Sequence, residues 1–295
     1  LSLTVNPEKQ AAIEIERLLK FPGFLKRDSF AKGRVEIVEL RVDERSRLCN
    51  VALSEMNRVI KCRVLVCAVL RRGDVVAPDG SFVLREGDRI FVTASTESLA
   101  TLLDNLGIIT KKVNHVMICG GGRVSYYLAQ QLEKDGMTVR LIEKDSKHCE
   151  ELAALLPKTE IINDDASNTF VLKRENIESC DALVTATGMD ELNMIISLYG
   201  TKHGVSQVIT KLGHMENGSM IDQLPIGSTI WPKDLCCNGI VRYIRAMHNQ
   251  TGAAVSVHSI ADGKAEAIEF HVEEKKPYCD KPLKNMKVKQ NILVT

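Results

Sequence analysis

The stretch VMICGGGRVS, residues 116–125, places three consecutive glycines directly after a short apolar run. The run at His115–Cys119 is apolar and partly β-branched, which predicts a buried strand. A helix is expected next, near residues 122–135, because apolar residues recur there at helical spacing: Val124, Leu128 and Leu132. Strand, glycine turn and helix in this order are the context in which a GxGxxG motif holds a diphosphate.

Each small residue of this stretch has an expected task. Gly120 allows a tight turn, and Gly122 lets a pyrophosphate approach the backbone. Ser125 takes the place of the third glycine and is small enough for the helix to pack on the strand. The phosphates would lie at the helix N-terminus, where free N–H groups and the helix dipole favour anions. The residues expected to form this cradle are Gly120, Gly121, Gly122, Arg123 and Val124.

An acidic residue follows at the spacing that ribose recognition requires. Glu143 ends the predicted strand Thr138–Glu143, about 20 residues after the glycines. A carboxylate there accepts hydrogen bonds from ribose hydroxyls and repels a 2′-phosphate, which favours NAD or ATP over NADP. The alternative for Glu143 is a solvated carboxylate at a strand end. Arg123 could bind a phosphate in bidentate fashion, and a solvated residue at a helix start is the equally weighted alternative.

Further strands at residues 160–163, 182–185 and 207–210 alternate with predicted helices. This alternation predicts an α/β fold, a Rossmann-like parallel sheet with helices on both faces. Polar or small residues follow these strands at the carboxyl edge, where ligands of open α/β sheets bind: Asp165 and Ala166, Thr187 and Gly188, and Lys211. For Thr187, Gly188 and Lys211, an ordinary loop position is the equally weighted alternative. We expect Asp165 to accept from an adenine amino group, although capping of the next helix, by it or by Asp164, is the alternative.

The chain also repeats itself. Gly33–Met56 recurs as Gly263–Met286 at a shift of 230 positions with eight identical residues, which indicates two copies of one unit. The copies predict four segments: 1–32, the C-terminal helix of a first Rossmann unit that lacks its front; 33–110, a first small α+β regulatory module; 111–250, a second Rossmann nucleotide-binding unit; and 251–295, part of a second regulatory module.

Within the first module we expect one strand from Val35 and another over Arg63–Leu70. A closing hairpin is expected between Phe82–Leu84 and Arg89–Val92, because Glu86-Gly87-Asp88 between them has the composition of a turn.

Composition and charge exclude several classes of protein. The chain has 39 basic and 38 acidic residues, a formal net charge of +1, so it lacks the positive charge that drives nucleic-acid binding. No apolar run approaches the roughly 18–20 residues of a membrane-spanning helix, so we expect no direct membrane insertion. Nine cysteines without CxxC spacing indicate reduced thiols and a cytoplasmic location. No catalytic pair and no zinc-ligand spacing stands out near the crevice, which favours a nucleotide that acts as a signal over one that reacts.

The motifs together resemble the regulator-of-conductance, or potassium-transport nucleotide-binding, family. The resemblance covers the whole chain and is carried by the glycine loop and by four further stretches: VRLIEKD at 139–145, DDAS at 164–167, ALVTATGMDELN at 182–193 and VITKL at 208–212. It implies tandem Rossmann units, each followed by a small α+β module. It also implies binding of NAD(H), or alternatively ATP/ADP, at the residues named above. As partners it implies a potassium-transporter membrane subunit and further copies of the chain in a ring, a dimer or tetramer, on the cytoplasmic face of the plasma membrane.

The resulting hypothesis is a nucleotide-gated regulatory subunit that is not an enzyme. One alternative is an NAD-dependent oxidoreductase, for which Lys211 or His214 would have to serve as the general acid. The other is a structural adaptor with an empty pocket.

Overall fold

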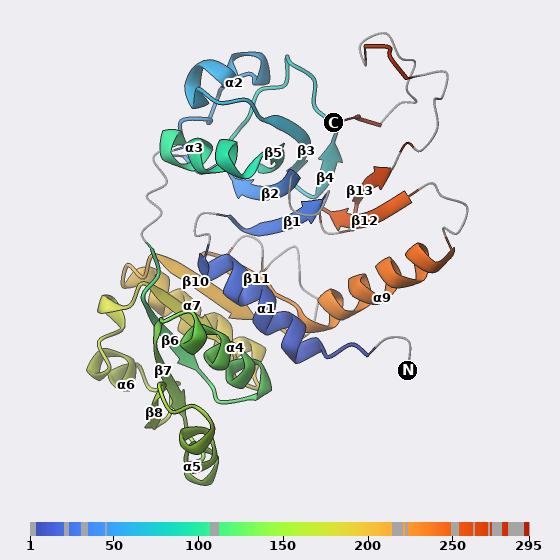
Figure 1. Cartoon of the computed structure of the whole chain (residues 1–295). Coiled ribbons are helices and arrows are strands. Elements are labelled where there is room, and N and C mark those ends of the chain that lie inside the picture. The colour runs from blue at the N-terminus through green and yellow to red at the C-terminus, as the bar shows by residue number, and fades with distance from the viewer. Residues whose placement is uncertain are drawn as a thin grey trace. The chain divides into compact units, whose positions relative to one another are not determined.

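A computed structural model of the chain describes residues 4–20, 24–30, 35–44, 46–106, 112–213, 221, 224–248, 254–261, 263–270, 272, 279–282 and 292–294 (Figure 1). The chain forms two compact units, and each draws on two separate segments of sequence. Unit 1 comprises Leu1–Pro22 and Thr110–Cys237, and unit 2 comprises Gly23–Ile109 and Asn238–Thr295.

Unit 1 is built on a six-stranded parallel sheet with the order β11-β10-β9-β6-β7-β8. Its strands are β6 (His115–Cys119), β7 (Thr138–Glu143), β8 (Glu160–Asn163), β9 (Ala182–Thr185), β10 (Gln207–Lys211) and β11 (Ser228–Ile230). β6 lies between β7 and β9, so the strand order reverses at β6. Ligands of open α/β sheets bind at such a reversal, outside the carboxyl ends of the strands.

Helices cover both faces of this sheet. They are α1 (Pro7–Lys20), α4 (Arg123–Lys134), α5 (Ser146–Leu155), α6 (Thr169–Arg174) and α7 (Asp190–Lys202), with a short 3-10 helix η2 (Ile177–Ser179) after α6. Alternate side chains of β6 enter different clusters: Val116 and Ile118 join the cluster of α1 and α4, whereas Met117 and Cys119 join that of α6 and α7. This confirms the expected Rossmann-like sheet with helices on both faces.

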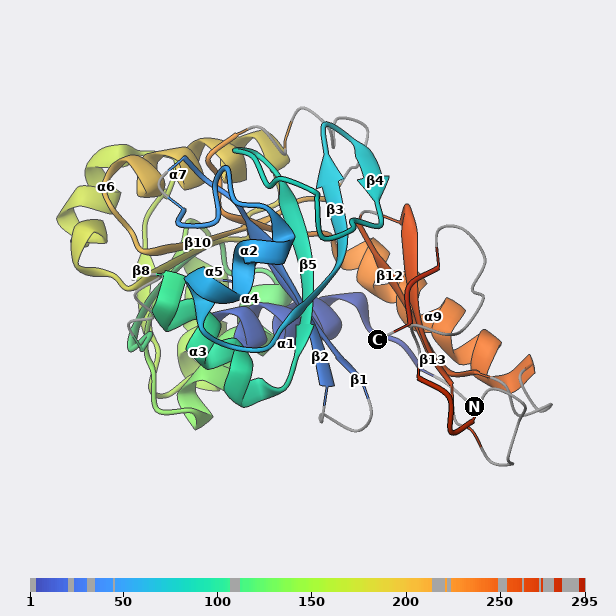
Figure 2. The same ribbon diagram turned by 90° about the horizontal axis from the view of Figure 1, so that it is seen from above.

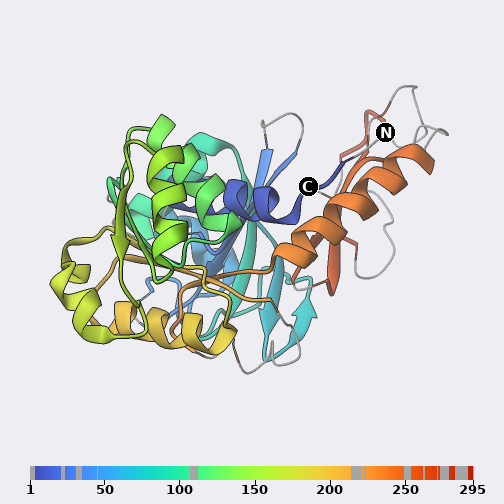
Figure 3. The same cartoon turned by 90° about the horizontal axis from the view of Figure 1, so that it is seen from below.

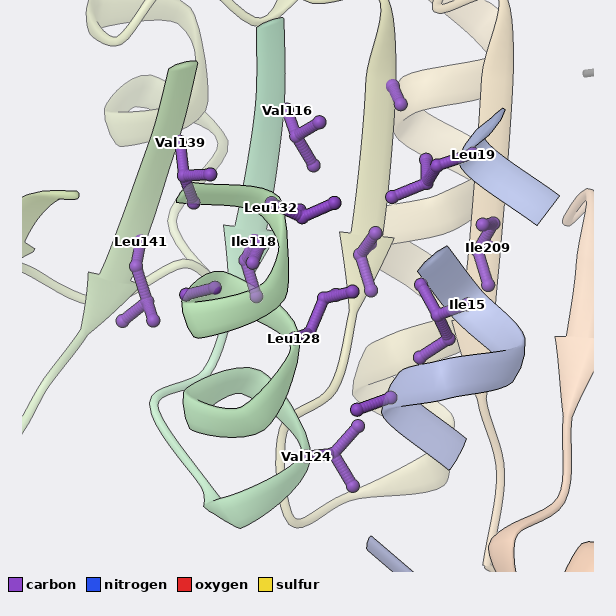
Figure 4. Close-up of a cluster of buried hydrophobic side chains, with 14 of the residues drawn as sticks. Ile15, Leu19, Val116, Ile118, Val124, Leu128, Leu132, Val139, Leu141 and Ile209 are labelled. Carbon is purple, nitrogen blue, oxygen red and sulfur yellow. The ribbon is translucent and has the colours of Figure 1, made fainter. Parts of the chain in front are cut away.

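Helix α1 belongs to the core of unit 1. Asn6 caps it, since its Oδ1 accepts from the Lys9 N–H at 2.9 Å, and Pro7 occupies the first turn, where no N–H is needed. The helix lies beside α4 (Figure 3). Its apolar face is buried: Ala11, Ala12, Ile15, Leu18 and Leu19. Figure 4 shows two of these side chains, Ile15 and Leu19, in the core. Each of the three larger side chains contributes about 1.5–3 kcal/mol through burial.

Unit 2 contains a five-stranded antiparallel sheet with the order β1-β2-β5-β3-β4. Its strands are β1 (Lys26–Phe30), β2 (Val35–Arg41), β3 (Leu65–Arg71), β4 (Asp74–Val76) and β5 (Arg89–Ala94). Helices α2 (Leu53–Ile60) and α3 (Thr96–Leu106) share one core with one face of the sheet. The strand-rich α+β composition expected for this segment is confirmed.

A hairpin from the far end of the chain packs its turn end against the other face of that sheet. Its strands β12 (Ala254–Ile260) and β13 (Ala265–Phe270) pair with each other (Figure 2). Ile260 and Ala261, at the turn, pack in a cluster with Ile37, Leu70 and Phe91. β13 begins 230 positions after β2, so the repeat in sequence corresponds to a repeat in structure. The helix α9 (Pro232–His248) precedes this hairpin.

The structure corrects one expectation and extends others. The closing hairpin does not form: Val83 makes only an isolated bridge to Ala52, and β5 pairs with β2 and β3 instead. Residues 86–88 do have the composition of a turn, but composition does not determine which strands pair. β5 pairs with β2 and β3, which lie far from this turn in sequence. The short strands β1, β4 and β11 had no expectation of their own. One of the helices predicted between and after the strands spans residues 215–223, and only residue 221 of that range lies among the described residues.

Candidate functional site

The glycine loop follows β6 and is shaped by its neighbours. Gly120 has φ +97°, and a Cβ added there would lie 2.8 Å from the Thr187 Cα and 2.9 Å from the Ala186 carbonyl oxygen. Its N–H donates to the Ile142 carbonyl at 2.8 Å. Both the dihedral angle and the backbone contact therefore require glycine, as the tight-turn expectation said.

Gly121 is held on three sides. Its N–H donates to the Glu143 Oε2 at 2.7 Å, and its carbonyl oxygen lies 2.8 Å from the His148 Nε2. A Cβ added there would come within 2.7 Å of the Leu152 Cδ1. A side chain at this position would therefore force Leu152 of α5 and Glu143 of β7 to shift.

Gly122 differs from the other two because it faces open space. It is the N-cap of α4 with φ −64° and ψ 179°, and a Cβ added there would meet no atom within 4 Å. It has no side chain with which to cap the helix, so the N–H groups of the first turn are presented to a ligand. The loop therefore combines open space beside Gly122 with free backbone N–H groups at a helix N-terminus, an arrangement that favours anions.

The residues at the start of α4 divide between core and surface. Ser125 is fully buried, as its role in helix packing requires, and the Val124 side chain is also buried, so Val124 can offer a ligand only its backbone. The Arg123 side chain is 81% exposed, and its Nη1 lies 3.8 Å from the Glu8 Oε1. That long, exposed ion pair leaves the guanidinium able to turn to an anion.

Glu143 ends β7 beside the loop. One carboxylate oxygen accepts from Gly121 as described, and the other accepts from the Asp145 N–H at 2.9 Å. Each oxygen retains a further lone pair, because a carboxylate offers about four acceptor positions. Two backbone N–H groups therefore fix the orientation of the Glu143 carboxylate beside the glycine loop. Glu143 is thus not a freely solvated carboxylate at a strand end.

The acidic pair after β8 does not cap α6, because Asn168 does: its Oδ1 accepts from the Phe170 N–H at 3.0 Å. Asp165 is exposed and accepts from the Ser167 N–H at 2.8 Å, a bond that lowers the pKa of its carboxyl. Asp164 pairs with Arg174 at 2.9 Å. The neighbouring Ala166 is buried.

The loop after β9 is tied to the end of β10 by a buried amide. Asn193 is fully buried, and its Oδ1 accepts from both the N–H and the hydroxyl of Thr187, at 2.9 and 2.7 Å. Its Nδ2 donates to the Lys211 carbonyl at 2.9 Å. The Lys211 ammonium donates to the Thr187 carbonyl at 2.7 Å, and burial lowers its pKa while Asp190 opposes that shift. The backbone of Thr187, next to Gly188, also lies directly against Gly120.

The structure therefore brings most expected residues to one edge of the sheet, around the carboxyl ends of β6, β7, β9 and β10. Two side chains of this edge had been assigned no role, Asn193 and His148. Asn193 lies in the stretch ALVTATGMDELN, and its role could have been predicted because it is a polar residue on the inner face of an expected helix. His148 had no signal, because its contact with Gly121 joins residues 27 positions apart.

Two negative findings concern the described part of the chain. It contains no group of three or more His, Cys, Asp or Glu side chains that could hold a metal ion. Within the same residues, no helix combines the length and the hydropathy needed to cross a bilayer.

Known proteins resemble this chain in both sequence and fold. Residues 116–232 match the TrkA-N domain family and residues 37–107 match the TrkA-C domain family. The chain is 31% identical over 269 residues to the Trk system potassium uptake protein TrkA of Haemophilus influenzae, covering 90% of this chain and 57% of that protein. It is 26% identical to Trk system potassium uptake protein TrkA homolog 1 of Methanosarcina mazei, covering 100% of this chain and 64% of that protein. The chain thus spans less than two thirds of these relatives.

Solved structures share the fold at lower identity. The RCK domain of GsuK matches with a TM-score of 0.58 and 16% identity, over 86% of this chain and 55% of that one. The GsuK channel bound to NAD matches with a TM-score of 0.56 and 17% identity, over 84% of this chain and 45% of that one. These matches concern the fold alone. The sequence matches, by themselves, show that the chain joins a TrkA-C domain to a TrkA-N domain.

Proposed function

We propose that unit 1 binds NAD(H) at the carboxyl edge of its sheet and that the chain is the nucleotide-sensing regulatory part of a potassium-uptake system. The observation that carries the proposal is the open face of Gly122 at the N-terminus of α4, beside the oriented carboxylate of Glu143. An N-terminal helix turn attracts a diphosphate, and a carboxylate at that position accepts from a ribose.

The other residues of the edge have supporting roles in this proposal. The backbone from Gly120 to Val124 surrounds the diphosphate, and Arg123 exchanges Glu8 for a phosphate oxygen. Asp165, exposed at the end of β8, accepts from the adenine amino group, with Ala166 beside it. Thr187 and Gly188 close the opposite side, held in place by Lys211. ATP or ADP would use the same adenosine contacts and is the alternative ligand.

The regulatory role rests on the relatives, whose names are those of potassium uptake proteins and not of enzymes. A bound nucleotide can bias a conformational equilibrium only through different affinity for its two states, and a coupling of about 1–3 kcal/mol is typical. The partner would be the membrane subunit of a potassium transporter. The chain would act as a homo-oligomeric ring, a dimer or tetramer, at the cytoplasmic face of the plasma membrane.

An NAD-dependent oxidoreductase receives less support. Such an enzyme would need Lys211 or His214 as its general acid. The Lys211 ammonium already donates to the Thr187 carbonyl. The other candidate, His214, lies outside the described residues. The relatives likewise give no support for hydride transfer.

Isothermal titration of the purified chain with NAD, NADH, ATP and ADP tests the proposal. We expect micromolar binding of NAD or NADH and no turnover. Gly122→Asp is the blocked variant, because its carboxylate would fill the open face and repel a diphosphate. No binding to the wild-type chain would favour an adaptor, and nicotinamide-linked turnover would favour the enzyme; either result would overturn the proposal. Equal binding by Gly122→Asp would remove the glycine loop from the site.

A further inference from the structure

His148, in the first turn of α5, links that helix to the glycine loop. Its Nε2 lies 2.8 Å from the Gly121 carbonyl oxygen, and its Nδ1 lies 3.2 Å from the Glu151 Oε2. On the other side of the same glycine, the N–H is held by Glu143. Both polar groups of Gly121 are therefore fixed by side chains, directly before the open Gly122.

The two partners of the imidazole favour its protonated form. A carbonyl oxygen and a carboxylate can only accept hydrogen bonds, so each ring nitrogen of His148 must carry a proton to satisfy both. A neutral imidazole has one N–H and could satisfy only one of them. The contacts of His148 are thus those of an imidazolium.

The surrounding charges favour the same form. The pKa of His148 is raised above its ordinary value by the hydrogen bond to the Gly121 carbonyl, then by the bond to Glu151, with a smaller contribution from the charge of Glu143 on β7. Partial burial opposes the shift. The cationic Arg123, at the start of the neighbouring α4, is highly exposed and forms an ion pair with Glu8.

We propose that His148 is a positioning residue of the nucleotide site, whose imidazolium holds the Gly121 peptide in the orientation that presents the next amides to a diphosphate. This inference rests on the proposed function. Loss of the proton removes one of the two hydrogen bonds and also removes a positive charge from the neighbourhood of the anion. Nucleotide binding should therefore weaken as the pH rises through the pKa of His148.

The sign follows from linkage. An anionic ligand near an imidazolium raises the pKa of the ring further, so the complex holds the proton to higher pH than the free chain does. Binding should therefore weaken by about three- to tenfold between pH 6 and pH 9. NAD is the suitable probe, because its diphosphate keeps its charge over this range, whereas a terminal phosphate titrates near pH 6.

The positioning contact can be tested without any ligand. In the chain labelled with ¹⁵N-glycine and ¹³C-histidine, the Gly121 amide resonance and the His148 ring should titrate together. In His148→Gln, which can still donate to the carbonyl but does not ionise, the Gly121 resonance should be independent of pH. A Gly121 resonance that ignores the titration of His148 in the wild-type chain would overturn the inference.

The second measurement is the dissociation constant of NAD at pH 6 and pH 9. We expect the wild-type chain to show the three- to tenfold change, and His148→Gln to show one constant at both values. The matched control is His203→Gln, since His203 also bonds to a glutamate, Glu178 at 2.8 Å, but not to the loop; it should retain the wild-type pH dependence.

The two proposals fail in different ways. Identical pH profiles for the wild-type chain and His148→Gln would overturn the role of His148 and leave nucleotide binding intact. No NAD binding at either pH would overturn the proposed function and, with it, the ligand part of this inference, even if the Gly121 resonance still follows His148.

Discussion

Replacing Gly120 by alanine should destabilise unit 1, whereas the same change at Gly122 should leave stability nearly unchanged and weaken nucleotide binding at least tenfold. At Gly120 the positive φ costs a non-glycine residue about 1–3 kcal/mol. The new methyl group would also meet the backbone of the loop after β9 at 2.8–2.9 Å, where no flexible side chain can move aside. Such overpacking costs about 1–3 kcal/mol more, so we expect a total loss of about 2–6 kcal/mol.

At Gly122 the geometry predicts the opposite outcome. Its φ of −64° suits any residue, and the methyl group would point into open space. The free energy of unfolding should change by less than about 1 kcal/mol, the size of a weakened helix cap. The same methyl group would occupy the space where the diphosphate must approach the backbone, so the affinity for NAD should fall at least tenfold, or about 1.4 kcal/mol.

The single tryptophan makes this comparison practicable. Trp231 directly follows β11 and is partly buried in unit 1, so its fluorescence during urea unfolding reports on the unit that carries the loop. Isothermal titration of NAD supplies the second readout. Wild-type stability in Gly120→Ala would refute the claim that the loop is held against the backbone after β9. Wild-type affinity in Gly122→Ala would refute the claim that the open face receives the ligand.

Three further predictions concern other contacts. Asn193→Ala should lower the unfolding free energy of unit 1 by about 2–4 kcal/mol, because it removes the partner of the partly buried Thr187 N–H and Lys211 carbonyl. Trp231 fluorescence measures this change, and a loss below about 1 kcal/mol would contradict it. Asp88→Asn should destabilise unit 2 by about 2–4 kcal/mol in calorimetry, because Asp88 is buried and accepts two bonds from Arg71 at 2.7 Å; an unchanged transition would contradict the pairing. At pH 8 an aromatic disulfide reagent should modify the exposed Cys237 but not Cys119, whose pKa burial raises to about 12; prompt modification of Cys119 would contradict its burial.

Elements defined by a local pattern could be predicted from the sequence. The strands at 115–119, 138–143, 160–163 and 182–185 have the expected bounds, because each is a short run rich in β-branched and other apolar residues between predicted helices. The glycine loop could be predicted equally well, because the strand before it and the helix after it are adjacent to it in sequence.

Contacts between distant segments could not be predicted in this way. The apolar face of α1 indicates burial but does not specify α4 as its partner, and the three residues of β11 are too few to show a period. The expected hairpin failed for the same reason, because β5 is paired by strands that lie far from its turn. The positions of Asn193 and His148 in the site likewise depend on which strand ends meet at one edge.

The sharing of each unit between two segments constrains how the chain can be made and divided. During synthesis α1 leaves the ribosome about a hundred residues before α4, so its apolar face must remain uncovered, or be held by a chaperone, until the later segment emerges. A fragment that begins after unit 2's first segment would lack both α1 and the Leu18 carbonyl that accepts from the buried Gln207 amide at 2.7 Å. Excising the nucleotide-binding unit as residues 111–250 should therefore yield an aggregating product, and joining α1 to its start through a flexible linker should restore solubility.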